Sequence, residues 1–151
     1  MHEVKRMVRL MTIADYEDVR ALWARTEGMG LNDVDDSRAG IEKYLLRNPN
    51  TCFVSEVGGA VNGVILAGHD GRRGYIHHTA VDKAARGTGL GRALVEAALS
   101  ALSAEGISKV ALVVFQRNQI GNGFWEKMGF AARTDLNYRN RALREPQRID
   151  T

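Results

Sequence analysis

A glycine-rich turn, Arg86-Gly87-Thr88-Gly89-Leu90-Gly91, is the segment whose residue types most clearly suggest chemistry, and Arg92 follows it. Glycines let a backbone approach an anion closely, and the first turn of a helix presents free N–H groups at the positive end of its dipole. Arg86 and Arg92 add positive charge nearby. The turn therefore predicts a site for a phosphate-like anion. The alternative is a tight connection between a strand and a helix with no ligand.

Two better-known phosphate motifs differ from this turn. A P-loop requires a lysine directly after its last glycine, and here that position is Arg92. The dinucleotide fingerprint places its glycines early in a βαβ series. Neither pattern matches the chain.

Two adjacent histidines, His77 and His78, are the candidate catalytic residues. Neighbouring residues of a strand point to opposite faces, so we expect one imidazole to face the cleft and act as a general base. The alternative is a pair of structural histidines. The strand carries no carboxylate, and a metal site would need further ligands at suitable spacing, so no metal is expected.

Hydrophobic periodicity predicts the elements that position these groups, a mixed α/β fold in the order β-α-α-β-β-β-α-β-α-β. A strand from Val4 to Leu10 precedes a helix that begins near Thr12 and carries Trp23 in its apolar stripe. Asp36 or Ser37 caps a second helix. The later strands are expected at 51–57, 60–68, 75–81, 109–115 and from Phe130 onward, and the later helices at 90–105 and 120–128.

Three of these strands have further sequence signals. Gly58-Gly59 lies between strands 51–57 and 60–68 and predicts a tight hairpin turn. The segment 109–115 is a continuous apolar run, which is typical of a strand covered on both faces.

Two sequence blocks resemble the GCN5-related N-acetyltransferase (GNAT) family. Residues 81–91, which end in the glycine-rich turn, look like its R/Q-x-x-G-x-G/A motif. Asn118 and the segment 124–130, Phe-Trp-Glu-Lys-Met-Gly-Phe, are similar to its asparagine, short helix and Y-E-K-x-G-F ending. The resemblance extends from the first strand to about Asn137. Within the family, the chain looks closest to small bacterial acetyltransferases of the YpeA type.

The resemblance implies acetyl-CoA as cosubstrate and direct transfer of the acetyl group to an amine. It implies that Thr79, Ala80 and Val81 offer backbone groups to the pantetheine arm, while residues 86–91 offer amides to the pyrophosphate. Asn118 would help to hold the CoA arm, and Trp125 would lie beside it. The family's tyrosine that often protonates the leaving thiolate aligns with Trp125, whose indole donates a hydrogen bond but is no practical acid.

In this family the loop between the first two helices, here Glu27 to Asp36, shapes the acceptor cleft. Glu27, Asn32 and Asp33 are therefore the expected acceptor-binding residues, with Asp35 and Asp36 as further acidic neighbours. The alternative is a set of helix caps in a solvated acidic loop.

These expectations define the predicted function, an N-acetyltransferase that acts on a primary amine of a small molecule or a protein. Trp125 and the missing carboxylate motivate an alternative from another class, a non-catalytic CoA-binding or interaction domain. Nucleic acid is not an expected partner, because the basic segment 139–144 lacks the aromatic side chains that stack on bases. Many family members are dimers, so a homodimer is possible.

Composition sets the remaining expectations. The 151 residues are 44% hydrophobic and 26% charged, with a net charge of +3, which predicts one globular domain over 1–151. The segment 137–151 is weakly patterned and is expected to be partly mobile. No apolar run is long enough for a signal peptide or a membrane span. The single cysteine, Cys52, is expected to be a buried thiol, and a cytoplasmic location is expected.

Overall fold

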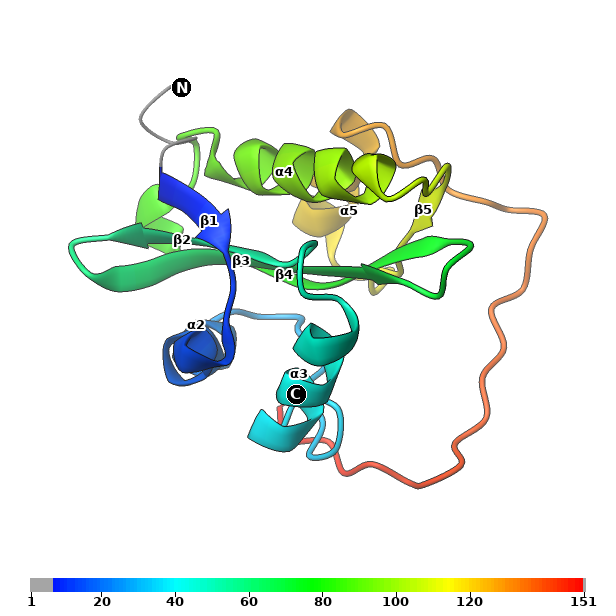
Figure 1. Ribbon diagram of the computed structural model, residues 1–151. Helices are drawn as coiled ribbons and strands as arrows, with labels where there is room; N and C mark the ends of the chain where they lie inside the picture. Colours follow the sequence, from blue (N-terminus) through cyan, green and yellow to red (C-terminus); the bar gives the residue numbers. More distant parts are fainter. Residues whose placement is uncertain (1–6, 151) are drawn as a thin grey trace.

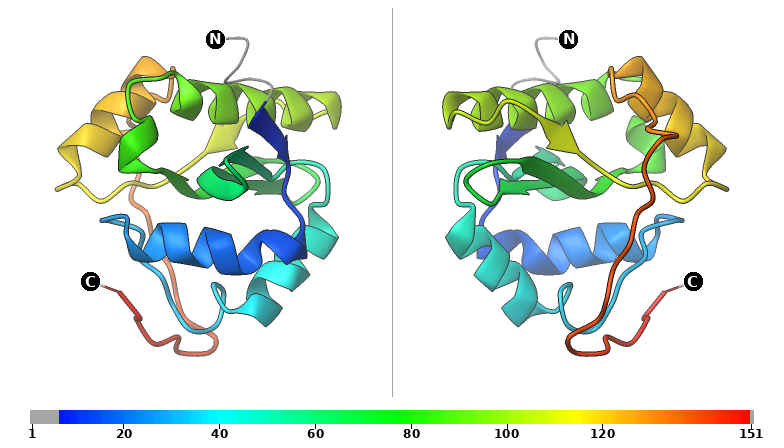
Figure 2. Two further views of the ribbon diagram at one scale, coloured as in Figure 1. Left: turned by 90° about the vertical axis from the view of Figure 1, so that its left-hand side faces the viewer. Right: turned by 90° about the vertical axis from the view of Figure 1, so that its right-hand side faces the viewer.

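A single five-stranded sheet organises the protein, and the computed structural model describes residues 7–150 of it (Figure 1). The sheet order is β1-β2-β3-β4-β5, with antiparallel pairs except for parallel β4 and β5. Helices α2 and α3 cover one face and α4 and α5 the other (Figures 1 and 2). The predicted mixed α/β class is confirmed. The elements are β1 Val8–Leu10, η1 Ile13–Asp15, α2 Tyr16–Ala24, α3 Arg38–Arg47, β2 Phe53–Val57, β3 Ala60–His69, β4 Gly74–Val81, η2 Lys83–Ala85, α4 Leu90–Ala104, β5 Val110–Ala111 and α5 Gln119–Lys127.

Two apolar clusters hold the helix layers against the sheet. One lies on the α2–α3 face and includes Leu22 and Trp23, which are 0% and 1% exposed. The other lies on the α4 face and includes Leu90 and Leu94. Leu90 belongs to the glycine-rich turn and is 1% exposed, so burial of its side chain fixes that turn against the sheet.

The predicted local signals form as expected in the first half of the chain. Gly58 and Gly59 have φ values of 57° and 78° and connect β2 to β3 as a hairpin. Ser37 caps α3, because its hydroxyl accepts a hydrogen bond from the amide of Gly40 at 3.0 Å. Trp23 lies in the core, as predicted. Of the first predicted strand, residues 4–6 lie outside the described residues, and β1 covers Val8–Leu10.

The last two predicted strands differ from the structure. β5 covers only Val110–Ala111, and the side chains that follow alternate between half-buried and exposed; Val113 is 61% exposed. The prediction of a strand covered on both faces is wrong, because the chain diverges from β4 after Ala111 and loses its ladder partner. No strand follows α5 in residues 7–150 either. The short β5 offers almost no free edge to which a strand from Phe130 could bind.

The segment after α5 instead runs past the open edge of the sheet to the loop between α2 and α3 (Figure 2). Its end is hydrogen-bonded there: Ile149 N donates to Leu31 O at 3.1 Å. Most of residues 131–146 are exposed. Whether residues 137–151 are partly mobile in solution stays a prediction.

Candidate active site

The divergence of β4 and β5 opens a cleft of about 460 Å³. The two strands pair only at Gly74–Val110 and Tyr75–Ala111, so from Ile76 to Val81 one edge of β4 has no strand beside it. Backbone groups along such an edge are available to an extended ligand. The cleft is lined by residues 28–30, 75–79 and 112–115, together with Asn118, Trp125, Tyr138 and Arg148.

The glycine-rich turn lies at the start of α4, on the α4–α5 side of the sheet. Gly87 and Gly89 have φ values of 79° and 88°, a left-handed conformation that favours glycine, and Gly89 is the N-cap residue of α4. Arg86, Thr88 and Arg92 are exposed. An ion pair of 2.9 Å between Arg25 and Asp82 connects α2 to the segment that precedes the turn and lowers the pKa of the Asp82 carboxyl. The turn therefore presents its amides and charged side chains to solvent from a fixed position.

Asn118 and Trp125 both line the cleft, from the α5 side. The side chain of Asn118 caps α5, because Oδ1 accepts a hydrogen bond from Gly121 N at 2.8 Å. Trp125 packs against Phe124 and Phe130, with ring centroids 5.0 and 5.3 Å away. The structure thus gives each residue a structural role and a position beside the cleft.

A β-bulge places both histidines on one side of the sheet. Leu66 pairs with His77 and Val64 with Ala80, so two residues of β4 lie opposite Ile65 alone. The extra residue interrupts the alternation: His77 contacts Tyr44 of α3, with ring centroids 5.6 Å apart, and His78 contacts Trp23 of α2 at 5.2 Å. The prediction that the two imidazoles point to opposite faces is therefore wrong. Their rings are 6.4 Å apart.

His78 is paired with a buried carboxylate. Its Nε2 lies 2.9 Å from Oδ1 of Asp36, whose side chain is 3% exposed. The other oxygen of Asp36 accepts a hydrogen bond from Asn32 N at 2.9 Å, and its carbonyl accepts one from Tyr16 Oη at 2.7 Å. A histidine that donates through Nε2 keeps a lone pair on Nδ1. The carboxylate of Asp36 thus orients the imidazole of His78, which lines the cleft.

His77 is exposed to the cleft but otherwise surrounded by protein. Burial, and next the neighbouring His78, lowers the pKa of its imidazole below the ordinary value of 6.5. The ring also stacks at 4.6 Å on Tyr75, whose phenol pKa is raised by burial. His77 is therefore neutral at neutral pH.

The three predicted acceptor-binding residues lie in the α2–α3 loop but do not line the cleft. Asn32 Oδ1 accepts hydrogen bonds from the amides of Val34 and Asp35, which shapes the loop itself. Asp33 Oδ1 accepts one from Gln147 N at 2.7 Å. Of this loop, the cleft is lined by residues 28–30, next to the predicted Glu27. No sequence pattern predicted the Asp36–His78 pair, because the pair depends on the bulge and joins residues far apart in the chain.

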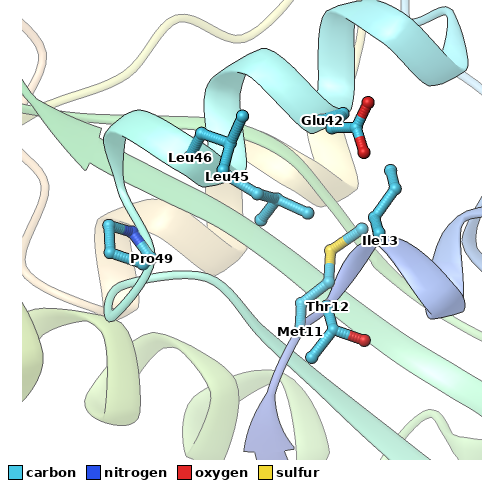
Figure 3. A pocket seen from close by; sticks show the side chains of 7 residues that line it. All are labelled: Met11, Thr12, Ile13, Glu42, Leu45, Leu46 and Pro49. Carbon is cyan, nitrogen blue, oxygen red and sulfur yellow. The ribbon is translucent and has the colours of Figure 1, made fainter.

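A second, smaller hollow of about 240 Å³ lies between η1 and α3 (Figure 3). Its lining is mainly aliphatic, and Glu42 is its charged residue. Figure 3 shows Leu45, Leu46 and Met11 around it. This hollow holds no paired acid–base groups like those of the cleft.

No helix among residues 7–150 is long and apolar enough to cross a membrane. Within the same residues, no three side chains of the metal-binding types gather at one point. Cys52 is 1% exposed, and burial raises the pKa of its thiol to about 12, so it is the buried, unreactive thiol that was predicted.

Known proteins resemble this chain in sequence and in fold. The acetyltransferase (GNAT) family model matches residues 16–130. An acetyltransferase of Photorhabdus laumondii is 33% identical over 126 residues, which cover 83% of this chain and 87% of the relative. Ard1 from Thermoplasma volcanium is 26% identical with a TM-score of 0.73, over 82% of this chain and 81% of that chain. Rv2747 from Mycobacterium tuberculosis, solved in complex with CoA, shares the fold at 21% identity and a TM-score of 0.64, over 81% and 69%.

Proposed function

Since this chain belongs to the acetyltransferase (GNAT) family, we propose that it moves the acetyl group of acetyl-CoA directly onto a primary amine of a small molecule or a protein. The family fixes the acetyltransferase activity and acetyl-CoA as its cosubstrate. The amine acceptor and the route of direct attack are the proposal. The observation that carries it is a cleft with an unpaired strand edge and with His78, paired with the buried Asp36, in its wall.

The donor binds on the α4–α5 side of the cleft in this proposal. Residues 86–92 hold the pyrophosphate through backbone amides and the arginines, and the start of α4 adds a favourable dipole. The pantetheine arm then follows the unpaired edge of β4 at Thr79, Ala80 and Val81. Asn118 and Trp125 border the arm from α5.

The acceptor enters from the α2–α3 side. Its neutral nitrogen attacks the thioester carbonyl carbon, the C–S bond breaks, and CoA leaves as a thiolate. A backbone N–H on the unpaired edge of β4 stabilises the oxyanion that forms in between. His78 accepts the proton that the nitrogen loses, while Asp36 fixes the imidazole through Nε2. His77, neutral beside it, completes the polar wall.

Trp125 does not prevent this reaction. A thiol has an ordinary pKa of about 8.5, so a thiolate leaves far more readily than an alkoxide or an amide anion. An acid that protonates the sulfur adds to the rate but is not essential to the step. The chain therefore needs no tyrosine at position 125 for turnover.

Thiol release tests the proposal. The purified protein is titrated with CoA and acetyl-CoA, and CoA release is then followed with a panel of amino acids, diamines, aminoglycosides and peptides. We expect saturable binding of both nucleotides, amine-dependent thiol release and a product heavier by one acetyl group. Binding with no amine-dependent release would contradict the proposed reaction and favour a non-catalytic CoA-binding domain.

We also propose a cellular compartment and an assembly state for this protein. The cytoplasm is the proposed compartment, because the only cysteine of the chain is a free, buried thiol. A homodimer is the proposed assembly, by resemblance to the family. Sedimentation velocity at several concentrations tests the second part, and a monomer at all of them would contradict it.

A further inference from the structure

The end of the chain is hydrogen-bonded to the loop that borders the cleft. Asp150 accepts hydrogen bonds from Gly30 N at 3.1 Å and Leu31 N at 2.7 Å. Asp33 N donates to Gln147 O at 3.0 Å, and Arg148 forms an antiparallel bridge with Asn32. Two further bonds, from Gln147 N to Asp33 Oδ1 and from Ile149 N to Leu31 O, make five hydrogen bonds between this end and the loop. Together they hold residues 147–150 in place, although most of the residues before them are exposed. The C-terminal segment 147–150 is therefore part of the acceptor side of the cleft.

This contact places a positive charge in the cleft wall. Arg148 lines the cleft, and its guanidinium carbon lies 5.4 Å from the ring centroid of Phe115. Arg117 lies over the same ring at 4.4 Å. Of the three guanidinium nitrogens of Arg148, only Nε donates a hydrogen bond to another described residue, namely to Asp150 at 3.2 Å. Its two terminal nitrogens thus remain available for a ligand.

The described lining of the cleft carries no negative charge that matches Arg148. None of the described residues that line it is Asp or Glu. Three carboxylates interact with residues of the cleft or of its bordering loop, and each is engaged: Asp36 binds His78, Asp150 binds two amides and Arg148, and Asp35 accepts a hydrogen bond from Asn32 Nδ2 at 3.2 Å. A polycationic acceptor would meet guanidinium groups with no free carboxylate, whereas an acceptor with a carboxylate would gain a bidentate partner.

We propose that the acceptor is an amine that also carries a carboxylate, of the amino-acid class, and that Arg148 binds this carboxylate while the amine faces His78. The inference rests on the proposed function and adds the substrate class. It excludes polyamines and aminoglycosides as preferred acceptors. It also makes the C-terminal segment a specificity element.

Matched acceptor pairs test this inference, with CoA release as the readout. Alanine is compared with alaninamide, and lysine with 1,5-diaminopentane, because each pair differs by one carboxylate. We expect kcat/KM to be at least about 10-fold higher for the carboxylate member, as for a charge-assisted bidentate pair. Arg148→Met should remove most of this preference and leave kcat/KM for the amide and diamine within about 2-fold. Arg148→Lys is the matched control and should retain part of the preference.

The outcomes separate this inference from the function on which it rests. Arg148→Met keeps the backbone bridge and both amide bonds to Asp150, so a loss confined to carboxylate acceptors supports a direct contact. Equal or better turnover of amides and diamines, unaffected by Arg148→Met, would overturn the inference and leave the acetyltransferase intact. No turnover of any amine by a protein that binds acetyl-CoA would overturn the proposed function and the inference with it.

Discussion

The two sides of the cleft are built in different ways. On the α4–α5 side, the proposed pyrophosphate site is one run of consecutive residues, 86–91, in which Gly87 and Gly89 adopt left-handed conformations at the start of α4. The α2–α3 side gathers residues from distant parts of the chain, namely Asp36, His78 and Arg148. A short turn that binds through its backbone suits a ligand that does not vary, such as a cosubstrate. A surface formed by side chains from distant segments can change those side chains without altering the fold. We expect substitutions on each side to affect only that side's function.

The largest effect is expected for His78→Gln. The amide of glutamine can still donate a hydrogen bond to Asp36, but it is no base. Acetyl transfer should fall by about 1,000-fold in kcat, within the range of general-base removal, while the dissociation constant of CoA stays the same. Stopped assays of CoA release and calorimetric titration measure the two quantities. A kcat within about 3-fold of the wild type would show that His78 is not the base.

The second largest effect is expected for Thr88→Glu, on the opposite side. Thr88 is exposed in the turn and has an ordinary φ, so the new carboxylate strains no backbone and repels the pyrophosphate. The dissociation constant of CoA should rise by about 100-fold, with little change in kcat at saturation. Thr88→Gln is the matched control, because it has the same size and also loses the hydroxyl bond to Ala85 O. Equal affinities of the two variants would contradict a pyrophosphate at this turn.

A smaller effect is expected for Asp36→Asn. The amide can no longer stabilise the imidazolium that forms at His78, and it can present either its oxygen or its NH₂ group to Nε2. We expect kcat to fall by about 10-fold to 100-fold, with CoA affinity unchanged, because Asp36 positions His78 without touching the substrate. The pH profile of kcat distinguishes this role from a structural one. An unchanged profile together with a lower melting temperature would mean that Asp36 only stabilises the loop.

The smallest effect concerns stability and the neutral His77. Because burial lowers the pKa of this imidazole below 6.5, the unfolded chain takes up a proton before the folded protein does as the pH falls. The contribution of the neutral His77 to stability is therefore fully present above pH 6.5, the pKa of the unfolded chain. It is lost as the pH falls from there through the lower pKa of the folded protein. The melting temperature of His77→Gln, measured relative to the wild type at the same pH, should rise as the pH is lowered from about 7.5 to about 5.5. A relative melting temperature that does not change with pH would contradict the shifted pKa.

The same contrast explains what could be predicted from the sequence. The hairpin, the glycine-rich turn and the helices α4 and α5 depend on neighbouring residues, and periodicity with turn chemistry located them within one or two residues. The bulge in β4, the early divergence of β5 and the return of residues 147–150 depend on contacts between distant segments. For that reason the histidine directions and the final strand were wrong, and Arg148 was not foreseen as a cleft residue.

Hydrogen exchange with and without CoA tests the separation of the two sides most directly. Amide exchange is followed by mass spectrometry in the wild type and in Thr88→Glu at a concentration of CoA that saturates the wild type. We predict slower exchange in residues 79–92 of the wild type, no change in residues 28–36 and 147–150, and no protection in Thr88→Glu. Protection of residues 28–36 with none at 86–91 would contradict the assignment of the α4–α5 side to the cosubstrate.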